Sequence, residues 1–149
     1  GRDRQTNGGS SLIFWDTSAF ARCFLPDEHG HKHALNLLRR ETRHAACTLL
    51  WPEATAALVR QARGPSRLLD EMLRVLSTFE IVDFGSGLCG PAIALVRRHR
   101  LRGADGAHLA SAVYAWRRLG LKTFFFATSD DMQAAAARAA GLHVLSPGT

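Results

Sequence analysis

TFFFATSD, residues 123–130, is the stretch that decides the fold class of this chain. Three consecutive phenylalanines without a polar interruption are typical of a strand buried on both faces, as in a parallel sheet. The polar residues that follow can cap a helix, so Ser129 and Asp130 predict an Ala-rich helix that ends before Gly141. The stretch therefore predicts a buried strand over 123–127 that leads directly into a helix.

The same alternation of short apolar runs and helical patterns extends over the rest of the chain. Strands are predicted at 12–15, 45–49, 79–84 and 142–145. Helices are predicted at 19–25, 31–43, 51–62, 68–78, 88–99 and 104–119. Strands that alternate with helices imply right-handed crossovers, which cover both faces of a mostly parallel sheet. The predicted fold class is therefore α/β, with three layers.

Length and composition indicate one globular domain. The chain has 149 residues, of which 46% are hydrophobic, so we expect a single core and no second domain of ordinary size. Residues 1–11 are interpreted as a flexible leader or a cloning remnant, which leaves 12–149 as the domain. Charged residues interrupt every apolar run, so no membrane span is predicted. Three widely spaced cysteines without a CxxC pair favour a reducing compartment, with the cytoplasm as the default location.

The charge of the chain is basic and dominated by arginine. Lys and Arg number 19 against 13 Asp and Glu, which gives a net charge of +6, and only Lys32 and Lys122 are lysines. Guanidinium groups pair bidentately with phosphate and stack on bases, so this composition favours a nucleic-acid partner. A second interpretation stays open, because a GC-rich genome also encodes abundant Arg, Ala, Gly and Leu.

Four acidic residues follow predicted strands or open the helices beyond them. They are Asp16, Glu53, Asp105 and Asp130. In an open parallel sheet these positions line one crevice, where ligands of this architecture bind, so we expect the four carboxylates to converge. Each acid alone has an ordinary alternative role, since Asp at a helix start caps backbone amides and Glu in a first turn opposes the helix dipole.

Converging carboxylates predict a divalent metal site. Such groups repel one another and raise each other's pKa unless a cation neutralises them, and ligation by oxygen alone selects Mg2+ or Mn2+ over zinc. One or two such ions can activate water and stabilise the leaving oxygen of a phosphodiester. The sequence therefore indicates metal-dependent cleavage of a nucleic-acid backbone.

A basic cluster leads directly into the helix that carries Asp105. It comprises Arg97, Arg98, Arg100 and Arg102. One interpretation is that these side chains bind substrate phosphates beside the metal. The alternative is a solvated helix end, where cations are favoured by the helix dipole.

Other polar residues near the acids are candidates for supporting roles. Ser18, with Thr128 or Ser129, is predicted to hydrogen-bond ligand carboxylates, water or substrate, or else to act as a plain helix cap. His108 either approaches the substrate or is a buried, hydrogen-bonded imidazole. Asp131 adjoins the proposed fourth acid and is an alternative to it, although Asp130 fits the strand-to-helix turn better.

Four segments of the chain resemble the signature segments of PIN-domain ribonucleases, in the order that this family uses. They are LIFWDTSAF (12–20), WPEATAAL (51–58), LRGADGAHLASA (101–112) and ATSDDMQAAAARAAGL (127–142). The likeness covers nearly the whole chain and is strongest to the single-domain VapC-type toxins of bacterial toxin–antitoxin pairs. It implies a three-layer α/β/α PIN-like domain.

The resemblance also implies roles for the acids and partners for the protein. Asp16 and Asp105 correspond to the principal metal-ligating acids, Glu53 to the glutamate that completes the site, and Asp130 to a more variable fourth acid. The implied activity is endonucleolytic cleavage of RNA with Mg2+ or Mn2+. The implied partners are a cognate VapB-like antitoxin, whose carboxy-terminal segment lies across the active-site groove, and a second copy of the chain in a homodimer.

Two other functions fit parts of the sequence. A non-catalytic PIN-like module would use the basic surface to bind RNA or a protein, and only the presence of all four acids argues against it. A phosphoryl-transfer domain would use Asp16 as its nucleophile, but Ser18 stands where the second acid of a D-x-D motif would be.

Overall fold

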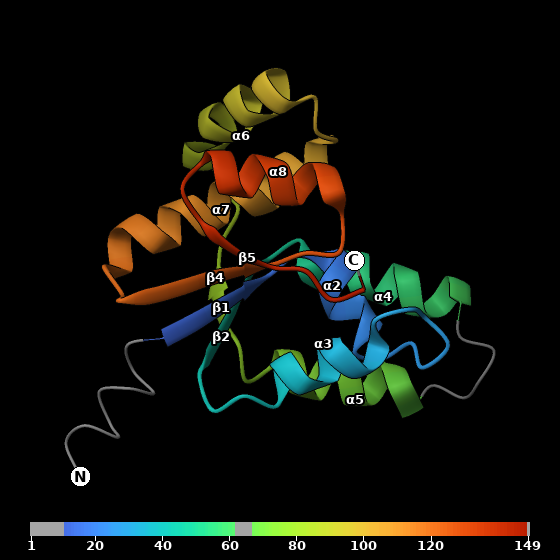
Figure 1. Ribbon diagram of the computed structural model, residues 1–149. Coiled ribbons are helices and arrows are strands. Elements are labelled where there is room, and N and C mark those ends of the chain that lie inside the picture. Colours follow the sequence, from blue (N-terminus) through green and yellow to red (C-terminus); the bar gives the residue numbers. More distant parts are fainter. Residues whose placement is uncertain (1–10, 62–66, 149) are drawn as a thin grey trace, which may run out of the picture.

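A computed structural model, which describes residues 11–61 and 67–148, shows a five-stranded sheet between two layers of helices (Figure 1). The strands are β1 (Ser11–Trp15), β2 (Arg43–Cys47), β3 (Glu80–Val82), β4 (Thr123–Ala127) and β5 (His143–Leu145). Their order is β3-β2-β1-β4-β5, and every pair is parallel. The α/β class and the three layers are therefore confirmed, and the sheet is entirely rather than mostly parallel.

Helices cover both faces of this sheet. They are α2 (Thr17–Arg22), α3 (His31–Leu38), α4 (Leu50–Gln61), α5 (Arg67–Leu76), α6 (Ser86–His99), α7 (Gly103–Leu119) and α8 (Asp131–Ala139). Helices α2 to α5 pack on one face, and α6 to α8 lie on the other (Figure 1). Over the described ranges 11–61 and 67–148, none of the helices combines the length and the hydropathy that a bilayer span requires.

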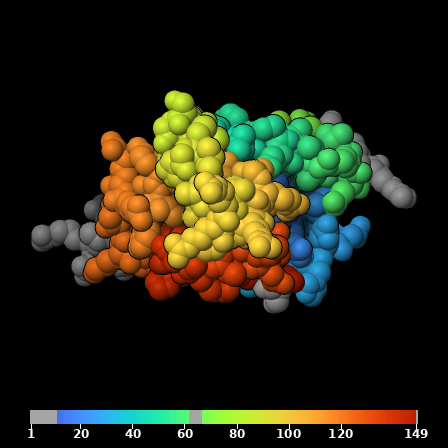
Figure 2. Space-filling model, turned by 90° about the horizontal axis from the view of Figure 1, so that it is seen from above, coloured from blue at the N-terminus to red at the C-terminus, as the bar shows by residue number. Residues whose placement is uncertain are grey.

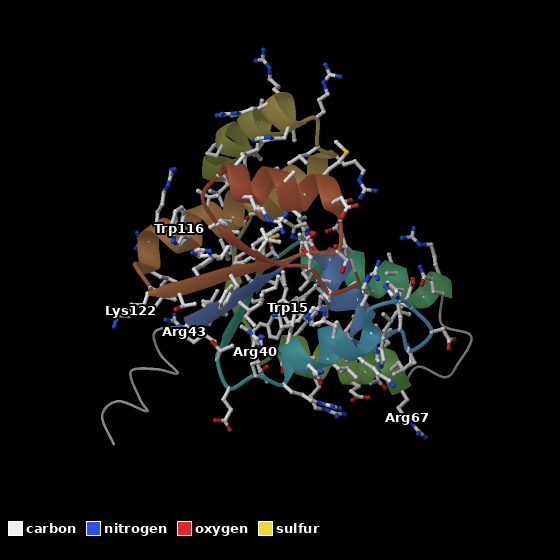
Figure 3. The ribbon with its side chains drawn as sticks, in the orientation of Figure 1. Trp15, Arg40, Arg43, Arg67, Trp116 and Lys122 are labelled. Carbon is white, nitrogen blue, oxygen red and sulfur yellow. The ribbon has the colours of Figure 1, made fainter. Side chains whose placement is uncertain are left out.

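Two hydrophobic cores lie on opposite sides of the sheet because side chains alternate along each strand. In β1, Ile13 and Trp15 enter the core beneath α2 to α5, whereas Phe14 enters the core beneath α7 and α8. Phe126 of β4 is fully buried against Phe14, with ring centroids 6.2 Å apart. The indole of Trp15 lies between the sheet and α3 (Figure 3) and donates a hydrogen bond of 3.0 Å to His44 Nδ1. The Phe-rich run is thus core, as predicted.

Several element boundaries differ from those predicted, because tertiary contacts set them. Helix α3 ends at Leu38, not near residue 43, since the chain turns so that the Thr42 hydroxyl donates to the Ser11 carbonyl over 2.7 Å. Arg43 is then already paired with β1, so β2 begins two residues before its predicted start. Strand β1 itself begins at Ser11, which the sequence assigned to the leader, whereas the rest of that leader, residues 1–10, lies outside the described residues.

Gly106, next to one of the four acids, allows α6 and α7 to pack closely. A Cβ atom at this position would lie 2.5 Å from Val96 Cγ2 and 3.1 Å from the Ala92 carbonyl oxygen. We expect Gly106→Ala to lower the free energy of unfolding by about 1–3 kcal/mol, because the two helices must separate to admit the methyl group. Urea denaturation followed by circular dichroism measures this change.

Gly103, at the start of α7, the helix that also contains Gly106, provides the matched control. A Cβ atom there meets nothing within 4 Å. Gly103→Ala should therefore change the free energy of unfolding by less than about 0.5 kcal/mol. Equal effects of the two substitutions would show that helix packing at Gly106 is not the cause.

Candidate active site

The four acids predicted from the sequence lie in segments that follow strands of the sheet or open helices, and hydrogen bonds and ion pairs connect these segments. Asp16 directly follows β1, and Asp130 follows the neighbouring strand β4. Glu53 lies in the first turn of α4, and Asp105 lies in the first turn of α7. The parallel order of the strands brings these segments together, as expected for a doubly covered sheet.

Asp16 is the most buried of the four acids, with an exposure of 2%. It caps α2 by accepting from the Ala19 amide over 3.2 Å. Its two oxygens also accept from the hydroxyls of Ser18, over 2.7 Å, and Thr128, over 2.5 Å. Burial raises the pKa of Asp16, although these hydrogen bonds act in the opposite direction. The protein therefore holds a carboxylate in place at an energetic cost, which a nearby cation would reduce.

The hydroxyl groups join the start of α2 to the loop before α8. Thr128 Oγ1 accepts from the Asp130 amide over 3.2 Å, and Ser18 Oγ accepts from the Ser129 amide over 2.8 Å. The predicted hydrogen bonds from Ser18 and Thr128 to a carboxylate are therefore present, and Ser129 donates its hydroxyl to the Pro147 carbonyl. These hydrogen bonds fix the position of Asp16 relative to the loop that carries Asp130.

A second network fixes Glu53. Its Oε1 accepts from Thr17 Oγ1 over 2.9 Å and is hydrogen-bonded to His108 Nε2. The other ring nitrogen of His108 lies 3.2 Å from Cys47 Sγ, at the end of β2. His108 is thus the buried, hydrogen-bonded imidazole that the sequence left as one of two alternatives. Thr17 and Cys47 were missed, and no sequence signal links Cys47 to a histidine 61 residues later.

The pKa values of Glu53 and His108 favour an ion pair between the two side chains at neutral pH. Burial lowers the pKa of His108, but hydrogen bonds with Cys47 and Glu53 outweigh it and raise the pKa to about 10. Burial raises the pKa of Glu53, yet the hydrogen bond to His108 and its charge leave that pKa below its ordinary value. Glu53 is therefore held as an oriented carboxylate beside the other acids.

Asp105 and Asp130 are joined by a guanidinium group. Arg102 Nε lies 3.1 Å from Asp105 Oδ2, and Arg102 Nη2 lies 3.5 Å from Asp130 Oδ2. Asp130 also caps α8 by accepting from the Gln133 amide over 2.9 Å, and the Gln133 side chain donates to the Asp105 carbonyl over 2.8 Å. These contacts favour Asp130 as the fourth acid over Asp131, which is exposed on the first turn of α8.

The predicted arginine cluster is divided by the structure. In the described part of the chain, Arg102 alone of the four contacts the acids. Arg97 and Arg98 are exposed in the last turn of α6, and Arg100 ends that helix in a left-handed conformation with φ of 56°. The surface of α6 and the loop after it lies between α4 and α8 (Figure 2). The structure therefore places Arg102 against the acids and the other three arginines on the surface at the end of α6.

The donor set fits a hard divalent cation, but the side chains must adjust to hold one. All four candidate ligands are carboxylates, which Mg2+ and Mn2+ prefer, and the contact of Arg102 with two of them shows that positive charge is favoured there. Among residues 11–61 and 67–148, however, no group of three His, Cys, Asp or Glu side chains is already arranged for a metal ion.

A phosphoryl-transfer enzyme with Asp16 as nucleophile is the rival function. The Asp16 carboxylate is buried, Oδ1 accepts hydrogen bonds from Ser18 and Ala19, and Oδ2 accepts one from Thr128. One lone pair of Oδ2 is left for a further contact. The argument against the rival function is therefore the residue at position 18, where Ser18 stands in place of the second acid of a D-x-D motif.

Comparisons with known proteins agree with the fold. The chain resembles a solved structure of PAE2754 from Pyrobaculum aerophilum, with 21% identity, a TM-score of 0.59, and 92% of this chain and 91% of that one covered. It resembles VapBC2 from Rickettsia felis bound to a promoter DNA fragment, with 13% identity, a TM-score of 0.64, and coverage of 91% and 98%. It also resembles a toxin–antitoxin complex from Klebsiella pneumoniae, with 17% identity, a TM-score of 0.58, and coverage of 93% and 98%.

Identities this low show the fold alone. No curated protein matches the sequence. The family model for the PIN domain does match, and it aligns with residues 13–139, which run from within β1 to the end of α8 and include all four acids. This match spans most of the chain and agrees with the order of the acid-bearing segments. The chain therefore belongs to the PIN domain family.

Proposed function

We propose that this protein is a metal-dependent endoribonuclease and the toxin of a VapC-type toxin–antitoxin pair. PIN domains are generally nucleases, and PIN nucleases generally use divalent metals. The observation that carries the proposal is the arrangement of four carboxylates at one edge of the sheet. Thr128 and Arg102 link Asp16, Asp130 and Asp105, and Thr17 and His108 hold Glu53. The net charge of +6 suits an RNA backbone as the substrate.

In this proposal the metal ligands are Asp16, Glu53, Asp105 and Asp130. A bound Mg2+ or Mn2+ would supply an activated water and neutralise charge on the scissile phosphate. The chain's own residues prepare this site: hydroxyls hold Asp16, and the buried His108 holds Glu53 in one orientation. Such rigid support matters because catalysis depends on closely fixed ligand geometry.

The partners are proposed from the solved structures with the same fold. The similar proteins from Rickettsia felis and Klebsiella pneumoniae are toxin–antitoxin complexes, and both are covered almost completely by this chain. We propose a VapB-like antitoxin as the physiological partner, a homodimer as the assembly and the cytoplasm as the location.

An assay of RNA cleavage tests the proposed activity. Purified protein is incubated with structured RNAs in Mg2+, in Mn2+ and in excess chelator, beside the variants Asp105→Asn and Asp131→Asn. Cleavage should require the divalent ion, vanish in Asp105→Asn and persist in Asp131→Asn, because only Asp105 belongs to the linked acids. Full cleavage in chelator, or by Asp105→Asn, would contradict the proposal.

A non-catalytic RNA-binding module is the second candidate. The contact of Arg102 with Asp105 and Asp130 favours it, because this cation already neutralises part of the acidic cluster. RNA binding that is unaffected by divalent ions, without any cleavage, would support this alternative.

A further inference from the structure

Arg102 lies between two acids that come from different parts of the fold. It is the residue before α7, and it joins Asp105 in that helix to Asp130 at the start of α8. The hydrogen bond to Asp105 and the charges of Asp105 and Asp130 raise the pKa of Arg102, so the group is charged at every working pH. The position between these carboxylates is therefore taken by a permanent cation.

This contact is weak enough to be exchanged. The Arg102 side chain is 80% exposed, and its distances to the acids, 3.1 and 3.5 Å, are at the long end for charge-assisted hydrogen bonds. Exposed ion pairs of this kind contribute little, because water screens them and the long side chain loses freedom. The side chain has no burial to hold it, so the guanidinium can leave the acids without disturbing the core.

We propose that Arg102 competes with a divalent cation for Asp105 and Asp130. This inference rests on the proposed metal site. A cation shared by the two carboxylates would lie where the guanidinium now lies, and two positive groups cannot both occupy that position. Binding of the ion therefore requires Arg102 to swing outward, and the affinity of the protein for the ion is reduced by the contact that must be broken.

Calorimetric titration with Mn2+ tests the competition directly. The full chain is compared with Arg102→Gln, which removes the charge, and with Arg98→Gln, which removes a charge from the last turn of α6 that does not contact the acids. We expect Arg102→Gln to bind Mn2+ about fivefold more tightly, the equivalent of about 1 kcal/mol. Arg98→Gln should change the affinity by less than about twofold, because salt screens distant charges.

Two further measurements separate competition from other causes. Arg102→Lys keeps the charge but replaces the fork by a single ammonium group, so its affinity should lie between those of the parent and Arg102→Gln. The gain in Arg102→Gln should shrink as salt is raised, because the contact is exposed. Thermal denaturation without metal checks that each variant folds.

The outcomes are distinct from those of the nuclease proposal. Unchanged or weaker Mn2+ binding by Arg102→Gln, an equal gain in Arg98→Gln, or no binding by either the parent or Arg102→Gln would overturn the competition. Tighter binding by Arg102→Gln, with no RNA cleavage by any form, would support the competition and overturn only the nuclease. RNA cleavage together with an unchanged Mn2+ affinity in Arg102→Gln would overturn the competition and support the nuclease.

Discussion

Asp16→Asn is expected to abolish RNA cleavage while leaving the protein as stable as the parent or more stable. Loss of a principal metal ligand should lower the rate by about 10³-fold or more, equivalent to about 4 kcal/mol of transition-state stabilisation. Cleavage of a structured RNA in saturating Mn2+ measures the rate, and urea denaturation without metal measures stability.

The stability result follows from the hydrogen bonds around Asp16. An Asn side chain keeps the oxygen that accepts from Ser18 and the Ala19 amide, and Asn is an equally good helix cap. Its new amide group can donate to Thr128 Oγ1, which still accepts from the Asp130 amide and can turn its own proton toward Ser18 Oγ, 3.2 Å away. No partner is left unsatisfied, and a buried charge is removed.

The difference in stability should depend on pH in a defined direction. The pKa of Asp16 is raised in the folded protein, so the unfolded chain releases this proton first as the pH rises. The parent should therefore lose stability relative to Asp16→Asn from about pH 4 upward. The loss stops once the pH passes the folded pKa. A constant difference across pH 3–8, or a variant that unfolds more easily at neutral pH, would show that burial is not the dominant influence on this carboxyl.

Asp131→Asn is the matched control for both measurements. Asp131 is exposed and lies one residue beyond the linked acids. Its replacement removes only a favourable charge from the first turn of α8, so stability should fall by at most about 1 kcal/mol and cleavage should continue. Loss of cleavage in this variant would instead identify Asp131 as the fourth acid.

Phe126→Ala is expected to have the largest effect on stability. The ring is fully buried in β4, beside the central strand β1, and stacks on Phe14. Its removal should lower the free energy of unfolding by about 3–5 kcal/mol, because apolar surface is lost and the surrounding strands cannot close the cavity. Urea denaturation measures the change, and a slope unchanged from the parent would show that the variant still unfolds in one step.

The control for Phe126 is an apolar residue on the surface. Ile93 in α6 is 58% exposed, so Ile93→Ala should change the free energy of unfolding by less than about 0.5 kcal/mol. A loss below about 1 kcal/mol in Phe126→Ala would contradict the structure, because it would mean that the two-sided burial of this strand contributes little.

Much of the fold could be predicted from local patterns. The strand over 123–127 has the predicted bounds, and α7 ends at Gly120 in the left-handed conformation that favours glycine. Asp16 and Asp130 do cap the helices that follow them, as an acid at a strand-to-helix turn suggests. These features depend on neighbours in the sequence, so the sequence contains the information. The early end of α3 and the early start of β2 were missed, because both depend on the pairing of β2 with β1.

The sequence by itself determined the α/β class, the family resemblance and the four acids, since apolar periodicity, helix caps and motif spacing are local properties. Only the tertiary structure decided which side chains meet. The strand order β3-β2-β1-β4-β5 joins Thr128 to Asp16, and it joins His108 to Cys47 and Glu53. The packing of α7 beside α8 lets one arginine reach two acids. Such contacts form between segments far apart in the chain, and their geometry follows from how the sheet and helices pack.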